Sequence, residues 1–166
     1  LERVPIGPWI SNPLTRHPAV VASALATLDD ARPGLVHLGI GTGDSAVFNI
    51  GLTPSRIAEL RDYVVAVRSL LEDGKAEYQG KTLLLSWPGP REIPIYIAAH
   101  GPRSLELAGE IGDGVVASTG VSPEQVEKVL SVIDIGARHS GRTVEELDVW
   151  FFTTVTVSTL GEEALE

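Results

Sequence analysis

The stretch PIYIAAHGPRSLELAGEIGDGVV, residues 94–116, decides the fold because it contains a strand, a helix and a second strand in close succession. Residues 95–99 form a short, continuously apolar run, which is typical of a parallel strand buried on both faces. Apolar residues at near-helical spacing follow, with Ser104 as the expected N-cap and Gly112 as the expected helix end. Residues 113–116 then begin another buried strand. The stretch therefore predicts a β-α-β unit.

The turn between the first strand and the helix is the expected place of function. The backbone N–H groups of residues 101–104 should point outward, because the first amides of a helix have no partner inside it. Gly101 permits close approach of a ligand, and Arg103 adds positive charge. Unpaired amides at a helix N-terminus favour anions, so this turn is predicted to bind a phosphate group.

The rest of the chain repeats the alternation of apolar strands and amphipathic helices. Two short extended segments within residues 76–87 predict a hairpin that turns at Gln79-Gly80. The other expected strands lie at residues 8–11, 36–40 and 149–157, and the other expected helices at residues 17–30, 53–71 and 123–140, the second of which opens at Thr53-Pro54.

Five parallel strands that alternate with four helices define an α/β protein, either an open doubly wound sheet or part of a closed barrel. A complete TIM (β/α)8 barrel takes about 250 residues, whereas this chain has 166. We therefore expect residues 1–166 to form a single partial TIM-barrel domain of about five units, with a small insertion near residues 76–90. On this interpretation the chain is a fragment of a longer polypeptide.

Composition excludes several classes of function. The formal net charge of −9 disfavours nucleic acid and anionic membranes, which attract clustered Lys and Arg. No apolar run approaches the roughly 20 residues of a membrane span, and no secretory signal is visible, so a cytoplasmic location is expected. The chain has no cysteine, and its four histidines lack ligand spacing, so no metal site is predicted.

Three segments together carry a resemblance to a known family. In this order and spacing, SNPLTRHPAVVASALATLDD (11–30), LGIGTGD (38–44) and the stretch 94–116 resemble the bacterial-luciferase-like superfamily of flavin and deazaflavin oxidoreductases. The branch they resemble most is related to methylenetetrahydromethanopterin reductase and uses coenzyme F-420, a deazaflavin. The resemblance implies a TIM barrel of which strands three to seven are present, and hydride transfer between the cofactor and a small organic substrate.

The resemblance also implies which turns hold the cofactor. It places the fifth-strand turn along the phosphate-bearing side chain, the fourth-strand turn near the deazaflavin ring, and the third-strand end against the cofactor. A non-prolyl cis peptide is expected just before that end, between Pro8 and Trp9. The implied cofactor residues are Ser11 and Asn12, then Gly41, Thr42 and Gly43, then Ala98, Ala99, His100, Gly101 and Pro102, to which the helix-end argument adds Arg103.

Two aspartates follow predicted strands and receive different interpretations. Asp44 lies in the fourth-strand turn, where related enzymes place a carboxylate, and it is the candidate acid–base residue. It could equally cap the next helix or solvate the turn. Asp113 is expected to shape the start of the strand that follows it.

Other functions remain open from the sequence. An FMN-dependent monooxygenase would share the fold and the phosphate seat. GIGTGD, residues 39–44, also matches part of a nucleotide-binding Rossmann turn, but the acids about 20 residues later, Glu59 and Asp62, fall within a predicted helix. A third reading is an inactive barrel fragment or scaffold without cofactor. Apolar surface left by absent strands predicts a homodimer or a larger homo-oligomer.

Overall fold

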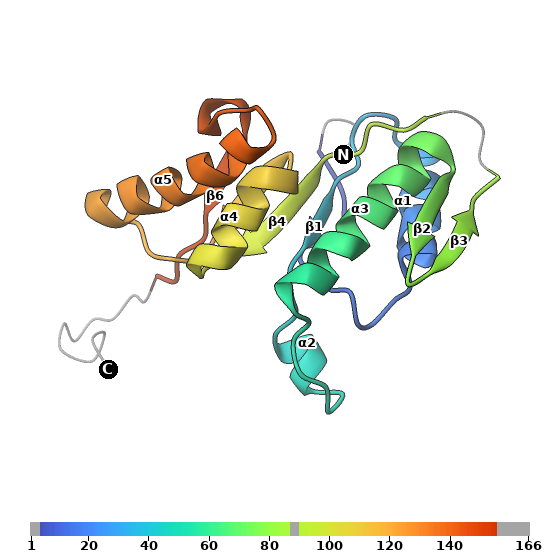
Figure 1. Ribbon diagram of the computed structural model, residues 1–166, viewed down its shortest axis with the longest axis horizontal. Helices are drawn as coiled ribbons and strands as arrows, with labels where there is room; N and C mark the ends of the chain where they lie inside the picture. Colours follow the sequence, from blue (N-terminus) through green and yellow to red (C-terminus); the bar gives the residue numbers. More distant parts are fainter. Residues whose placement is uncertain (1–3, 87–89, 156–166) are drawn as a thin grey trace.

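A computed structural model describes residues 4–86 and 90–155 of the chain. Four of its helices are long, and its strands are short (Figure 1). The elements in chain order are α1 (Pro18–Ala31), β1 (Leu38–Ile40), α2 (Ser45–Phe48), α3 (Ile57–Asp73), β2 (Lys75–Tyr78), β3 (Lys81–Leu84), β4 (Ile95–Ala99), α4 (Pro102–Ile111), β5 (Gly114–Ala117), α5 (Pro123–His139), the 3-10 helix η1 (Val144–Glu146) and β6 (Asp148–Phe151).

The main sheet is parallel and has the order β1-β4-β5-β6. Residues 6–11 run beside β1, which they meet through the parallel bridges Ile6 to Val36 and Ser11 to Ile40. Strand order thus follows chain order with no reversal, whereas a doubly wound sheet reverses at its switch point. Helices α3 and α4 lie over the same face of the sheet (Figure 1). This arrangement is an arc of a (β/α)8 barrel, as the sequence predicted.

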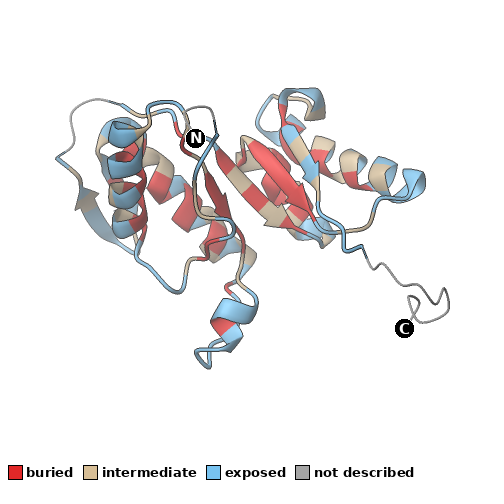
Figure 2. Ribbon diagram, turned by 180° about the vertical axis from the view of Figure 1, so that it is seen from behind, coloured by how far each residue is buried: buried red, intermediate tan, exposed pale blue. Residues whose placement is uncertain are grey.

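The two faces of the sheet differ in burial. In β4, Ile95 and Ile97 are fully buried beneath the helices, whereas Tyr96 and Ala98 point to the other side and are half-buried. Figure 2 shows the same division over the whole molecule, with buried residues on the strands and on the helix surfaces that meet them. We call the side away from α3 and α4 the open face.

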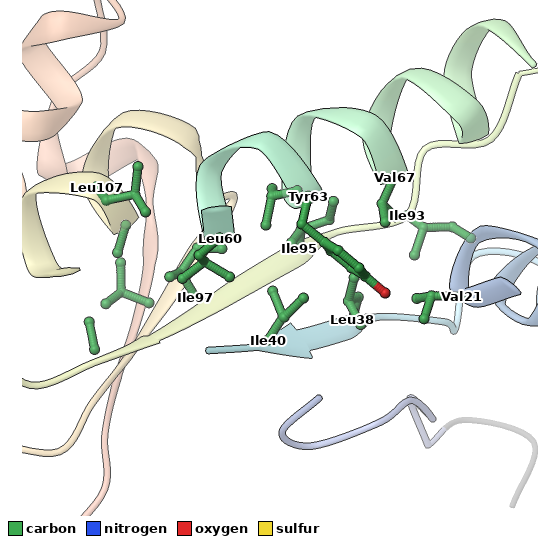
Figure 3. Close-up of a cluster of buried hydrophobic side chains, with 14 of the residues drawn as sticks. Val21, Leu38, Ile40, Leu60, Tyr63, Val67, Ile93, Ile95, Ile97 and Leu107 are labelled. Carbon is green, nitrogen blue, oxygen red and sulfur yellow. The ribbon is translucent and has the colours of Figure 1, made fainter. Parts of the chain in front are cut away.

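The hydrophobic core lies between α3 and the strands β1 and β4 (Figure 3). Leu60 and Val67 of α3 are fully buried, and each such side chain stabilises the fold by about 1.5–3 kcal/mol. Tyr63 is buried beside them, and its hydroxyl donates to the carbonyl of Arg16 at 2.9 Å. Burial raises the pKa of this hydroxyl, so it stays a neutral donor. Among residues 4–86 and 90–155, no helix is long and apolar enough to cross a membrane.

Several local predictions are confirmed. The strand 95–99 has the predicted bounds, and the helix after it closes at Gly112. Strands β2 and β3 form the predicted antiparallel hairpin, and both turn residues, Gln79 and Gly80, have positive φ. Trp87 of the predicted hairpin, and residues 87–89 of the expected insertion, lie outside the described residues.

Two helix starts differ from prediction. Helix α3 begins at Ile57 instead of Thr53-Pro54, because the N–H of Ser55 is held by the Thr42 carbonyl at 2.9 Å. The first turn of α3 is then closed by the Glu59 carboxylate, which accepts from the Arg56 N–H at 2.8 Å. Helix α4 begins at Pro102 with Gly101 as its N-cap, so Ser104 is not the N-cap.

Three further differences concern residues 8–11, β6 and α2. The cis peptide joins Trp9 to Ile10, one bond later than expected. Strand β6 ends at Phe151, and residues 156–157 of the predicted strand lie outside the described residues. Helix α2 follows β1 without having been predicted, because it is a single turn that few local signals mark.

Candidate functional site

The turns after β1 and β4 meet at the carboxyl edge of the sheet, where α/β proteins bind ligands. The register pairs Ile40 with Ile97, so Gly41 lies beside Ala98. A Cβ atom added to Gly41 would lie 3.2 Å from the Cβ of Ala98 and 3.6 Å from Cγ2 of Ile10. Gly41 is therefore packed closely between Ala98 and Ile10, with little space for a side chain.

A cavity of about 450 Å³ opens between these turns and the starts of α3 and α4. Its size falls within the range of small-molecule sites. The lining mixes apolar groups with a guanidinium, an imidazole and hydroxyls. The lining residues are Thr42, Ile57, Ala98, His100, Gly101, Pro102, Arg103 and Ser104.

The N-terminus of α4 supplies the positive pole of this cavity. The Ser104 hydroxyl accepts from the Gly101 N–H at 3.2 Å and donates to the Gly101 carbonyl at 2.9 Å. The expectation of outward amides throughout 101–104 is therefore corrected: Gly101 is engaged, and Pro102 has no N–H. The N–H groups of Arg103 and Ser104 have no acceptor within the described part of the chain. Together with the exposed Arg103 guanidinium they suit an anion.

Gly101 keeps this pole open. A Cβ atom there would meet only the Ser104 Oγ, at 3.9 Å, and the backbone has an ordinary extended φ of −93°. Neither crowding nor backbone conformation therefore requires glycine at this position. Its lack of a side chain leaves space directly in front of the first turn of α4.

The β1 turn places a carboxylate at the same edge. Gly43 has φ +108°, and a Cβ atom there would collide with the side chain of Val47, so only glycine fits. Asp44 is the N-cap residue of α2, yet its side chain makes no capping hydrogen bond to that helix. This exposed carboxylate makes no hydrogen bond to a residue that the structure describes, which leaves it free to meet a ligand.

Ser11 and Asn12 form the third side of the edge. Both are buried, and the backbone of Ser11 bonds to the Gly39 carbonyl at 2.8 Å and to the Gly41 N–H at 3.0 Å. The Asn12 side-chain oxygen accepts from the N–H groups of Leu14 and Thr15, both at 3.0 Å. That oxygen therefore shapes its own turn, and the Asn12 NH₂ group remains for ligand contact.

The structure brings most of the expected residues together. Of the eleven expected cofactor residues and Asp44, six line the cavity, whereas Ser11, Asn12, Gly41, Gly43 and Asp44 lie at the same edge of the sheet without lining it. Ala99 is the exception. Its side chain is buried in the core under the helices, and its carbonyl accepts from the Ser118 N–H at 3.1 Å. The alternation of side chains along β4 was the signal that could have excluded it.

Sequence reasoning missed three residues of this edge, Ile57, Ser55 and Thr119, whereas Ser104 was already expected in the phosphate-binding turn. Ile57 and Ser104 line the cavity, and the Ser55 hydroxyl donates to the Thr42 carbonyl at 3.1 Å. Thr119, after β5, has a buried hydroxyl without a hydrogen-bond partner among the described residues. The misplaced start of α3 hid Ile57 and Ser55, and no local signal marks Thr119.

Other kinds of site find less support. A second hollow of about 500 Å³ lies between the start of α3 and the hairpin, and it is lined by charged residues such as Arg56, Glu59 and Asp62. None of the predicted site residues lines it. In residues 4–86 and 90–155, no three His, Asp or Glu side chains are arranged to hold a metal ion.

Comparisons with known proteins agree with the fold and show the family. Residues 2–166 match the family described as luciferase-like monooxygenase. A 5,10-methylenetetrahydromethanopterin reductase from Methanopyrus kandleri is 33% identical, over 99% of this chain and 54% of the relative. An F420-dependent glucose-6-phosphate dehydrogenase from Microbacterium testaceum is also 33% identical, over 99% of this chain and 53% of the relative.

A solved structure extends the agreement to three dimensions. An F420-dependent secondary alcohol dehydrogenase, in complex with an F420-acetone adduct, superposes with a TM-score of 0.80 and 27% identity. The superposition covers 98% of this chain and 53% of the other. The chain thus spans about half the length of the relatives that it matches.

Proposed function

The chain belongs to the luciferase-like monooxygenase family. We propose that it functions in a coenzyme F-420-dependent oxidoreductase that acts on a small organic substrate. The main support for the proposal is the open anion-binding turn at the carboxyl edge, which Gly101, Arg103 and Ser104 form. Relatives named as F420-dependent enzymes, at 33% identity over nearly the whole chain, support the choice of cofactor. When bound, the deazaflavin would supply the hydride transfer.

The residues present fit such a cofactor. The N–H groups of Arg103 and Ser104 and the Arg103 guanidinium would hold a phosphate group. The small side chain of Ala98 lines the cavity and would leave room for a flat ring system at the edge of the sheet. The NH₂ group of Asn12 lies at the same edge and would hydrogen-bond a polar atom of the ligand.

Asp44 would act as the acid–base residue. Its exposed carboxylate would accept a proton from a substrate hydroxyl and return it to a carbonyl oxygen in the reverse direction. Removing the charge by Asp44→Asn should leave cofactor affinity within about twofold, while turnover falls by about 10²–10⁴-fold. Loss of cofactor binding together with turnover would assign Asp44 to cofactor binding instead.

FMN chemistry is the second candidate. The family description names a monooxygenase, and the phosphate of FMN would bind to the same anion-binding turn at the N-terminus of α4. A barrel scaffold that has lost cofactor binding is the third.

One competition experiment separates the three. The purified chain is mixed with equal F-420 and FMN and desalted, and the bound cofactor is identified from absorbance and fluorescence. Retained F-420 supports the proposal, retained FMN favours the monooxygenase, and retention of neither supports the scaffold. Arg103→Ala should reduce retention about tenfold through loss of a charge-assisted hydrogen bond. The matched control Lys81→Ala removes an exposed charge from the hairpin and should retain cofactor like the wild type.

A homodimer or larger homo-oligomer is also proposed. Trp9 and Trp150 are exposed on the open face, with their ring centroids 6.5 Å apart, and Ile10 beside them is exposed as well. Apolar surface of this kind favours association, and the net charge of −9 does not favour nucleic acid as the partner. Sedimentation velocity should show a species of at least twice the chain mass of 17.7 kDa. A monomer at all concentrations would contradict this.

A further inference from the structure

Two hydrogen bonds hold the ends of the loop after β1 together. Both the N–H and the hydroxyl of Ser55 bond to the Thr42 carbonyl, at 2.9 and 3.1 Å, and so close the segment 43–54. Val47 is fully buried against Gly43 and accepts from the Leu52 N–H at 3.1 Å. The loop is therefore held in one shape at the edge of the site.

Three large apolar side chains are nevertheless exposed on this loop. Phe48 is 56% exposed, Ile50 57% and Leu52 45%. Helix α2 and the turn after it project from the body of the molecule beyond β1 (Figure 1). Asp44, the second residue of the loop, is its only charged residue. We call Phe48, Ile50 and Leu52 the apolar arm.

The size of the apolar arm indicates what it contacts. Three half-exposed side chains of this kind offer on the order of 300 Å². A stable protein interface needs about 800 Å² from each partner. The apolar arm is too small for that, but it is large enough to cover the hydrocarbon part of a small molecule.

We infer that the apolar arm recognises the substrate, which is an uncharged organic molecule with an apolar group of several carbons. The inference rests on the proposed function, since the arm starts at the proposed acid–base residue, Asp44. It names the substrate class of that site: the polar atom of the substrate meets Asp44, and its hydrocarbon group lies against Phe48 and Ile50. The carboxylate of Asp44 and the negative net charge both disfavour an anionic substrate.

The test measures ligand binding to the full chain by saturation-transfer NMR, with and without F-420. The probes are methyl ketones of four, six and eight carbons, and hexanoate as the anionic probe. Affinity should rise about threefold for each added methylene, and hexanoate should bind at least tenfold more weakly than the six-carbon ketone, on the order expected for charge repulsion at a desolvated site.

Two variants test whether the ketones bind to the apolar arm. Phe48→Ser and Ile50→Ser should each weaken the eight-carbon ketone about tenfold and the four-carbon ketone less than twofold. Ile135→Ser is the matched control, because Ile135 is 51% exposed on α5 and should leave every affinity unchanged. Circular dichroism confirms that each variant is folded.

The outcomes separate this inference from the proposed function. If F-420 binds but the ketone affinities do not depend on Phe48 or Ile50, the apolar arm is not a recognition element and the inference fails alone. If F-420 does not bind while the ketones still bind through the arm, the cofactor proposal fails and the apolar site stands. If Phe48→Ser changes the sedimentation coefficient instead of ketone affinity, the arm is a protein contact and the inference is overturned.

Discussion

The two ends of the parallel sheet use polar residues in opposite ways. At the amino end, the Asp113 carboxylate accepts from the Ile95 N–H at 2.8 Å and from Arg68 at 2.9 Å. The Asp148 carboxylate accepts from the Tyr96 hydroxyl and the Trp150 indole N–H, both at 2.8 Å. Each of these groups thus ties a strand start to a neighbouring element, which confirms the structural role predicted for Asp113.

At the carboxyl end, polar groups are left without protein partners. The N–H groups of Arg103 and Ser104, the Asp44 carboxylate and the Thr119 hydroxyl find no hydrogen-bond partner among residues 4–86 and 90–155. The buried Thr119 hydroxyl costs stability while it has no partner, whereas the exposed Asp44 and Arg103 are open to solvent and to a ligand. Polar side chains thus stabilise the fold at the amino end of the sheet, whereas those at the carboxyl end are left for binding.

The largest expected effect is a loss of stability at the amino end. Asp113→Ala leaves the part-buried Ile95 N–H without its acceptor and removes one partner of the Arg68 guanidinium, which keeps the Ile111 carbonyl and Glu72, so the free energy of unfolding should fall by about 3 kcal/mol. Urea denaturation measures this. The control Asp73→Ala, at an exposed helix end, should stay within about 0.5 kcal/mol of the wild type. Reduced F-420 affinity of the folded Asp113→Ala protein would erase the distinction between the two ends.

The second effect is a loss of binding at the carboxyl end. Gly101→Asn keeps a good N-cap residue, so the free energy of unfolding should change by less than about 0.5 kcal/mol. Its side chain fills the space before Arg103 and Ser104, and F-420 affinity should fall about 10- to 100-fold through loss of charge-assisted hydrogen bonds. Fluorescence titration checks this. Unchanged F-420 affinity in a folded variant would show that Gly101 does not form part of the anion-binding turn.

The third effect is a gain of stability. Thr119→Val replaces a buried, unpaired hydroxyl by a methyl group of similar shape, so the free energy of unfolding should rise by about 1 kcal/mol. Thermal unfolding followed by circular dichroism measures the change. Destabilisation would mean that the Thr119 hydroxyl has a hydrogen-bond partner in solution. This part of the carboxyl end would then use its polar groups for stability, as the amino end does.

The smallest effect is a pH dependence at the amino end. Burial, followed by the hydrogen bond to Asp148, raises the pKa of Tyr96 to about 12 from its usual value of 10. The folded state thus favours the protonated hydroxyl, whose contribution is complete below pH 10 and is lost as the pH rises through 12. Urea unfolding at pH 9, 10 and 11 should show a steeper loss of stability in the wild type than in Tyr96→Phe. Equal slopes would contradict the role of this hydroxyl.

The sequence predicts those features that short segments decide. The apolar run 95–99, the Gln79-Gly80 turn and the close of α4 at Gly112 all follow from local patterns, and the structure confirms them. The carboxyl-edge turns were also predicted, because Gly41 follows one apolar strand directly and Gly101 follows another after His100.

Features that depend on distant contacts were not predictable. The start of α3 is set by the bond between Ser55 and Thr42, 13 residues apart. The unpaired Thr119 hydroxyl and the exposed apolar arm depend on which surfaces the fold covers. No pattern within a single segment reports such coverage.

Hydrogen–deuterium exchange with and without F-420 tests the central claim, that ligand binding is confined to the carboxyl end of the sheet. The amides of Arg103 and Ser104 should become protected when F-420 binds, while the Ile95 amide, already bonded to Asp113, should exchange at the same rate in both states. Bound F-420 that leaves Arg103 and Ser104 unprotected, or that protects only the amino end, would contradict the account.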